Sequence, residues 1–265
     1  MLKFNLTNAC LLLCLTAGLA TAAGAQPKLT IDAAVITQDY GTDRGSLTSA
    51  QLDYKLEYSD TTVLLSPVFG GRSGGGETVY SAGIGGTIYH NWSPGFSTRT
   101  SVFVAENTPV FAHLDIGQDV TLRIAKNTTL TAGARWARYF GGHDLAFQSI
   151  GLRYYFEGGS ASYTVMRINP DNRDAFFGQL FNLSVNDAQG AGKTQLWLSS
   201  GTTPYDRIQP EDNVSGDDYA AVLQRYQPLG QNLNLIVGAG ITSYARPTGR
   251  TTGSNFKLGI SLPVD

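Results

Sequence analysis

The 265-residue sequence is poor in cysteine and in charge. Its two cysteines, Cys10 and Cys14, both lie near the N-terminus, which excludes a fold held together by a network of disulfide bonds. Charged residues make up 15% of the chain, against about 25% in an ordinary soluble domain. The formal net charge is −2, so the chain lacks the basic surplus that is typical of nucleic-acid-binding proteins, and no nucleic-acid partner is expected.

Apolar runs long enough for a transmembrane helix are also lacking after residue 25. The stretch before that point has the features of a secretory signal. Lys3 gives a positive start, residues 10–25 carry no charge, and Ala23-Gly24-Ala25 fits a small-x-small cleavage site. We therefore predict that residues 1–25 are a cleaved signal peptide, that the mature chain begins at Gln26, and that the protein is exported.

The remaining chain, residues 26–265, is dominated by alternation of apolar and polar residues in blocks of roughly ten, separated by turn residues. In 51–58, for example, one face carries Leu52, Tyr54, Leu56 and Tyr58, and the other carries Gln51, Asp53, Lys55 and Glu57. About fourteen blocks of this kind can be distinguished. They predict an all-β fold, a single antiparallel transmembrane β-barrel of 12–14 strands in the outer membrane.

A secreted soluble β-sandwich would also show alternation, but two features favour the barrel. Charged residues stand in the middle of strands, where a polar lumen accommodates them, and aromatic residues gather near strand ends, where interfacial girdles lie. The residues expected in the girdle are Trp92, Phe96, Phe111, Trp136, Phe140, Tyr154, Phe156 and Tyr244.

The charged residues of the polar faces are expected to line the lumen. They are Asp53, Lys55, Glu57, Arg99, Asp115, Asp119, Arg123, Arg135, Arg153 and Lys257. Both signs are present, so two interpretations stay open. Oppositely charged residues can pair across strands and fill a closed lumen, or they can line an open pore and set its ion preference.

The C-terminus ends like the strand that barrel-insertion machinery reads in outer-membrane proteins. Residues 257–264 follow the spacing polar, x, Gly, apolar, x, apolar as far as Leu262. Lys257 is the polar residue, Gly259 the glycine, and Ile260 and Leu262 are the apolar residues. Val264 stands where such strands carry an aromatic residue. We expect outer-membrane lipid and the insertion machinery as partners, while the oligomeric state stays open.

The second half of the chain resembles the YaiO family of outer-membrane β-barrels. The resemblance rests on short segments shared with the family, namely 131–135 (TAGAR), 151–156 (GLRYYF), Ser162-Tyr163 after the Gly158-Gly159 turn, 198–201 (LSSG) with Pro204, and Leu258-Gly259-Ile260. Membership implies one outer-membrane domain. It implies no established activity, cofactor or catalytic residue.

No residue pattern predicts an enzyme. His90, His113 and His143 are scattered, the mature chain has no cysteine, and no spacing matches a catalytic or metal-binding motif. We therefore predict no catalytic residue, no metal and no cofactor. The leading hypothesis is a small channel or transport-related barrel for small or saccharide-like solutes.

A closed structural or binding barrel is the alternative hypothesis. Its long polar loops, expected at 70–77, 201–217 and 245–253, would contact a partner or a surface polysaccharide. An outer-membrane hydrolase is the third hypothesis, and no motif favours it.

Overall fold

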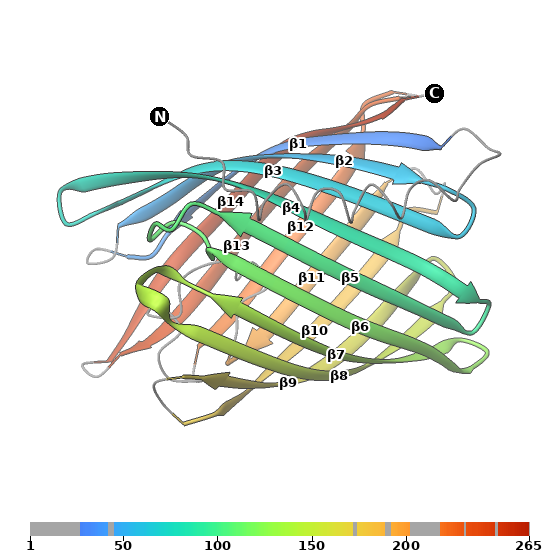
Figure 1. Ribbon diagram of the computed structural model, residues 1–265. Helices are drawn as coiled ribbons and strands as arrows, with labels where there is room; N and C mark the ends of the chain where they lie inside the picture. The colour runs from blue at the N-terminus through green and yellow to red at the C-terminus, as the bar shows by residue number, and fades with distance from the viewer. Residues whose placement is uncertain are drawn as a thin grey trace, which may run out of the picture.

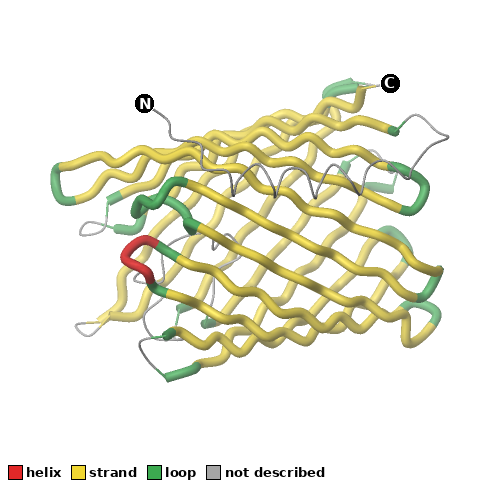
Figure 2. The backbone as a smooth tube through the Cα atoms, viewed as in Figure 1, coloured by secondary structure: helices red, strands yellow, loops and turns green. Residues whose placement is uncertain are grey.

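The structure, a computed structural model, describes residues 27–41, 45–171, 174–188, 192–201, 218–230, 232–246 and 249–264. The predicted signal peptide, residues 1–25, lies outside these ranges. Among the described residues, no helix is long and apolar enough to cross a membrane. Nearly the whole described chain is β-strand, as Figure 2 shows, and one short 3₁₀ turn, η1 (Phe140–Gly142), interrupts it.

Fourteen strands follow one another along the chain. They are β1 (Lys28–Asp39), β2 (Ser46–Glu57), β3 (Thr61–Gly74), β4 (Glu77–Ser93), β5 (Phe96–Ala105), β6 (Leu114–Ala125), β7 (Thr128–Arg138), β8 (Asp144–Phe156), β9 (Gly159–Pro170), β10 (Phe176–Asn186), β11 (Lys193–Ser200), β12 (Tyr219–Pro228), β13 (Asn234–Arg246) and β14 (Gly249–Val264).

The strands close into one antiparallel barrel in which each strand pairs with its neighbours in the sequence. The ring closes where β1 pairs with β14, from Leu29 opposite Val264 to Asp39 opposite Ser254. Figure 1 shows the first and last strands side by side in this way, blue β1 beside red β14, with the strands tilted along the wall. Closure leaves no sheet edge, so every strand finds hydrogen-bond partners without water, as a bilayer requires.

Alternation along each strand sends apolar side chains outward and polar ones inward. In β6, Ile116, Val120, Leu122 and Ile124 are exposed on the outer face, whereas Asp115 is only 7% exposed on the inner face. In β14, Phe256, Leu258 and Ile260 are exposed outside in the same manner. An outer surface of exposed aliphatic and aromatic side chains is suited to lipid and not to water.

Short turns lie at one end of the barrel. Residues 58–60, 94–95, 126–127 and 157–158 connect strands there, and both barrel termini, Lys28 and Val264, lie at the same end. Connections at the other end include the longer segment 106–113. Since outer-membrane barrels have short periplasmic turns and longer extracellular loops, the end with the termini is the periplasmic end.

The prediction of long loops is wrong for two of the three segments. Residues 70–77 belong mostly to β3 and β4, which are joined by Gly75-Gly76 with φ of 61° and 87°. Two consecutive positive φ values make the tightest hairpin turn, and glycine adopts them without strain. Residues 245–253 likewise belong mostly to β13 and β14. Polar, glycine-rich sequence looks like a loop, yet here it continues strands whose inner face is polar. The third loop, 201–217, lies outside the described residues except for Gly201.

Candidate functional site

The inner surface of the barrel encloses a cavity of about 1000 Å³. Side chains of β1 to β11 and of β14 line it, and small polar residues predominate. Examples are Ser49, Thr87, Ser101, Thr131, Ser149, Ser162, Thr164, Asn182 and Gln195. This polar lining follows from alternation, because the residue types that cannot face lipid point inward.

Six of the charged residues expected in the lumen line this cavity, namely Arg99, Asp115, Asp119, Arg135, Arg153 and Lys257. Gln51 of β2 lines the cavity. Asp53, Lys55 and Glu57 lie on the same face of that strand and follow it toward the periplasmic end. Arg123 shares the face of Thr121 on β6, and the pairing with β7 shifts register just after it.

Arg135 and Asp115 form the tightest ion pair in the lumen. Arg135 Nε donates to both carboxylate oxygens of Asp115 at 2.9 Å, and Nη2 donates to Oδ2 at 2.5 Å. The guanidinium also lies over the ring of Phe147, 4.7 Å from its centroid. A forked contact with a buried carboxylate fixes both side chains against the wall between β6 and β8.

A second pair lies further along the same wall. Arg99 and Asp119 are directly opposite each other on β5 and β6, with Nε 3.3 Å from Oδ2, and Arg99 lies over the ring of Tyr89. Gly133 on β7 makes room for this carboxylate, because a Cβ at that position would be 2.1 Å from Oδ1 of Asp119. The glycine in the TAGAR segment therefore serves a packing role inside the lumen.

Polar contacts on β2 hold the carboxylates at that wall. Gln51 Nε2 donates to the two oxygens of Asp53 at 2.7 and 2.9 Å. Lys55 Nζ is 2.7 Å from Oε1 of Glu57. Asp53 also lies opposite Asp32 of β1, whose buried Oδ1 has no hydrogen-bond partner.

Several cations of the inner face have no ion pair with any described residue. Among them are Arg123, Arg153, Lys257 and Lys193, the first residue of β11. Lys193 was missed by the sequence reasoning because β11 is short and begins at this residue. The alternation of Lys193, Gln195 and Trp197 could have identified it, since the latter two line the cavity.

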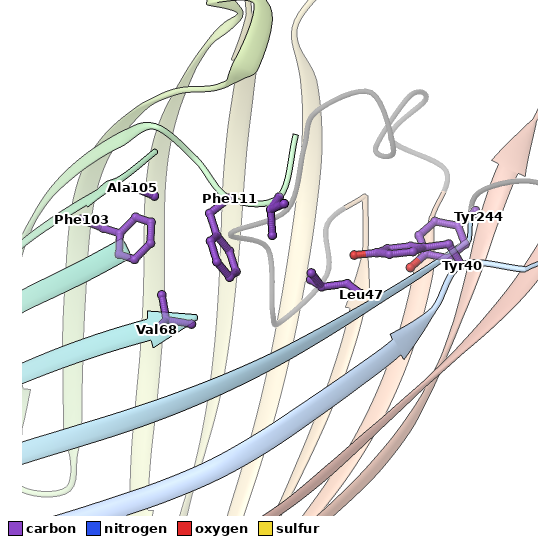
Figure 3. Close-up of a cluster of buried hydrophobic side chains, with 8 residues drawn as sticks. Tyr40, Leu47, Val68, Phe103, Ala105, Phe111 and Tyr244 are labelled. Carbon is purple, nitrogen blue, oxygen red and sulfur yellow. The ribbon is translucent and has the colours of Figure 1, made fainter. Parts of the chain in front are cut away.

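An apolar cluster narrows the extracellular end of the lumen. It contains Tyr40, Leu47, Val68, Phe103, Ala105, Val110, Phe111 and Tyr244. Figure 3 shows Phe111 and Phe103 close together inside the wall, with Leu47 and Val68 nearby. The two phenyl rings make an edge-to-face contact with centroids 6.2 Å apart. The segment 106–113 thus folds inward and fills part of the mouth.

The prediction that Phe111 and Tyr244 belong to an outer aromatic girdle is wrong. They are 5% and 2% exposed and belong to the apolar cluster inside the barrel. Phe111 lies in a connection that turns inward, where strand alternation does not apply. Tyr244 lies on the inner face of β13, and its hydroxyl accepts a hydrogen bond from Nε2 of Gln38 at 3.0 Å. Both rings meet other apolar side chains and not lipid.

The other six girdle candidates lie toward strand ends. Trp92, Phe140, Tyr154 and Phe156 are exposed, Trp92 to 63%, and Phe96 and Trp136 are half-buried. The indole of Trp92 donates to Oγ1 of Thr98 at 3.0 Å.

The three histidines do not form a common site. His90 packs edge-to-face against Trp92, and its Nδ1 is 2.8 Å from Oγ1 of Thr61. His113 contacts the carbonyl oxygen of Ala105 through Nδ1 at 2.8 Å. His143 Nδ1 is 3.9 Å from Oδ1 of Asp171. Within the part of the chain that the structure describes, no group of His, Cys, Asp or Glu could hold a metal ion.

Comparisons with known proteins agree with this architecture. The fold is similar to that of the Pseudomonas putida toluene transporter TodX, with a TM-score of 0.58 and 10% identity over 91% of this chain and 90% of that one. It is also similar to the CymD monoaromatic hydrocarbon channel, with a TM-score of 0.57 and 8% identity over 95% of this chain and 92% of that one. At these identities the likeness shows a shared fold.

The family comparison extends the resemblance found in the second half of the chain to the first half. The model of the YaiO membrane beta barrel domain matches residues 28–206, from the first strand through β11. The chain therefore belongs to the YaiO family of outer-membrane β-barrel proteins.

Proposed function

We propose that the barrel is a passive channel for small polar solutes across the outer membrane. One observation carries the proposal, the cavity of about 1000 Å³, most of whose lining residues carry a hydroxyl, amide or charged group. Such a surface hydrogen-bonds to hydrated solutes and resists being emptied of water. We further propose that the chain reaches the membrane after removal of residues 1–25 and with the help of the insertion machinery.

The lining favours saccharide-like solutes over hydrocarbons. TodX is named a toluene transporter and CymD a monoaromatic hydrocarbon channel, but most residues that line the lumen described here are polar, beside some apolar ones. Trp197 offers a flat apolar face beside the amides of Asn182 and Gln195, and Tyr155 lines the same cavity. A sugar ring matches this combination, because it has an apolar face and a polar edge. The proposal includes no catalytic step.

A closed binding barrel is the second candidate. The inward-folded segment 106–113 and its apolar cluster favour it, because they obstruct the extracellular mouth. The two functions differ in whether ions pass.

Single-channel conductance of the refolded mature chain in a planar bilayer tests the proposal. We expect discrete current steps, and we expect Gln195→Trp to reduce them because the indole projects into the cavity. Leu196→Trp is the matched control, since the next residue of β11 faces the lipid. A correctly folded barrel that gives no steps would refute the channel and favour the closed barrel. Equal conductance of the two variants would show that the current does not pass through this cavity.

A further inference from the structure

The charges that line the cavity do not cancel. Arg135 pairs with Asp115 and Arg99 pairs with Asp119, so these four residues contribute no net charge. Among the charged residues that touch the cavity, Arg153 and Lys257 remain. Both are cations, so the lining as a whole is positive.

The two remaining cations have different surroundings. Lys257, on β14, lies within electrostatic range of the carboxylates of Asp53 and Asp32. Arg153 has no carboxylate partner among the described residues. It lies instead within electrostatic range of Lys193, which is repelled by Arg153 and also by Lys55.

The three cations come from separate parts of the wall. Arg153 stands near the periplasmic end of β8, Lys193 begins β11, and Lys55 lies near the periplasmic end of β2. Only Lys55 has an acidic neighbour, Glu57. Like charges brought together by a fold raise its free energy unless a counter-ion occupies the space between them. The carboxylates in this half of the lumen, those of Asp32, Asp53 and Glu57, lie on β1 and β2, so the excess of positive charge lies on the wall from β8 to β11.

The residues beside Arg153 add selectivity for hydroxyl groups. Register places Arg153 opposite Ser162, Ser162 opposite Asn182, and Asn182 opposite Trp197. All four line the cavity, so they form one row across the inner face of β8 to β11. A guanidinium, a hydroxyl, an amide and an indole in one row match a carboxylate, the hydroxyls and the apolar face of a sugar acid.

We propose that the row from Arg153 to Trp197, together with Lys193, is a binding site for small hydroxylated carboxylates and makes the channel anion-selective. The inference rests on the proposed function and specifies its substrate class. Two unit charges about 10 Å from the path favour an anion over a cation by roughly 3-fold with salt screening and roughly 15-fold without it.

The first test is the reversal potential of the refolded chain across a potassium chloride gradient. We expect chloride to be preferred, and the preference to grow as the salt concentration falls. Arg153→Gln with Lys193→Gln should abolish most of the preference, and glutamate at both positions should reverse it. The matched control replaces Lys126 in a periplasmic turn and Arg167 on the outer face of β9 by glutamine, and should leave the preference unchanged.

The second test is uptake into proteoliposomes, with glucuronate compared with glucose. The wild-type barrel should favour glucuronate, and the Arg153→Gln, Lys193→Gln variant should lose this advantage while it still admits glucose. Steps with cation preference, or a variant that behaves like the wild type, would refute the anion site and leave the channel standing. A folded barrel without steps would refute the channel itself. Resistance to unfolding in cold detergent shows that each variant is folded.

Discussion

Phe111 offers the sharpest test of how the extracellular mouth is closed. Its segment is anchored at both ends by main-chain bonds, from Ala105 N to His113 O at 3.1 Å and from His113 N to Arg138 O at 2.8 Å. Between these anchors only Val110, Phe111 and Ala112 are buried. The tip of the Phe111 ring also reaches β3, where it lies 2.7 Å from the place that a Cβ on Gly70 would occupy. Phe111 is therefore the main side chain that holds the segment inside.

The cost of removing this ring can be worked out from its burial. Replacing a buried Phe by Ala costs about 3–5 kcal/mol, and water from the lumen can enter the gap, so the lower figure applies. Since each ~1.4 kcal/mol is a factor of ten, about 3 kcal/mol shifts the equilibrium between the inward and the released segment by roughly 100-fold. Phe111→Ala should therefore raise single-channel conductance and expose the segment.

A thiol placed on the segment measures its release directly. The mature chain contains no cysteine if residues 1–25 are removed, so Val110→Cys introduces a unique thiol at a position that is 1% exposed. A membrane-impermeant maleimide should label it slowly, and the added Phe111→Ala change should speed labelling up to about 100-fold.

Phe140→Ala serves as the control, because this ring belongs to another extracellular connection and is exposed. It should change neither conductance nor labelling. If Phe111→Ala likewise changed neither quantity, the burial of the ring would not be what holds the segment, and the reasoning would be refuted.

Three further predictions concern stability and assembly. Gly133→Ala should lower resistance to detergent unfolding by about 1–3 kcal/mol, because its Cβ would overlap the Asp119 carboxylate, and Asp119→Ala in the same chain should relieve the clash. The hydrogen bond from Arg225 lowers the pKa of Asp187, in the turn after β10, so its contribution to stability is complete above the unfolded-state pKa near 3.9 and disappears as the pH falls through the lower folded pKa. When the free energy of unfolding is measured against pH, the Asp187→Asn variant should lack this acid-dependent contribution. Val264→Phe should raise the fraction of barrel inserted in a reconstituted assembly assay, because residue 264 faces outward where insertion signals carry an aromatic side chain.

Most of the fold could be predicted because lipid imposes a simple rule on a strand. Side chains on the outer face are mostly apolar, so the alternation of apolar and polar residues predicts which face of the strand each side chain occupies. Ile116, Val120 and Leu122 follow this rule and place β6, although Gln118 on the same outer face is polar. The rule also identified charged residues of the lumen. Asp115 and Arg135 could be assigned to the inner face from their positions in the alternation alone.

The partners of these charges could not be predicted in the same way. Asp115 lies opposite Ala137 and Phe103 in the ladders, and yet its carboxylate binds Arg135, two residues from Ala137 along β7. Such a diagonal contact depends on register and side-chain reach, which alternation does not encode. Phe111 was misplaced for a related reason, because a connecting segment has no fixed parity and its path is set by what it packs against.

The contrast between paired and unpaired charges links the fold to the proposed transport. The pairs that involve Asp115 and Asp119 stabilise the wall between β5 and β8, and Asp115 in particular would otherwise be buried without a counter-charge. An arginine that served only the wall would be expected to have such a partner. Arg153 has none among the described residues, and its exposed side chain lines the cavity, where it is accessible to a passing solute. Selectivity should therefore respond to Arg153 with little change in stability, whereas stability should respond to Asp115 more strongly than selectivity does, because removing that carboxylate leaves Arg135 without its counter-charge. A barrel in which both substitutions altered stability equally would contradict this division.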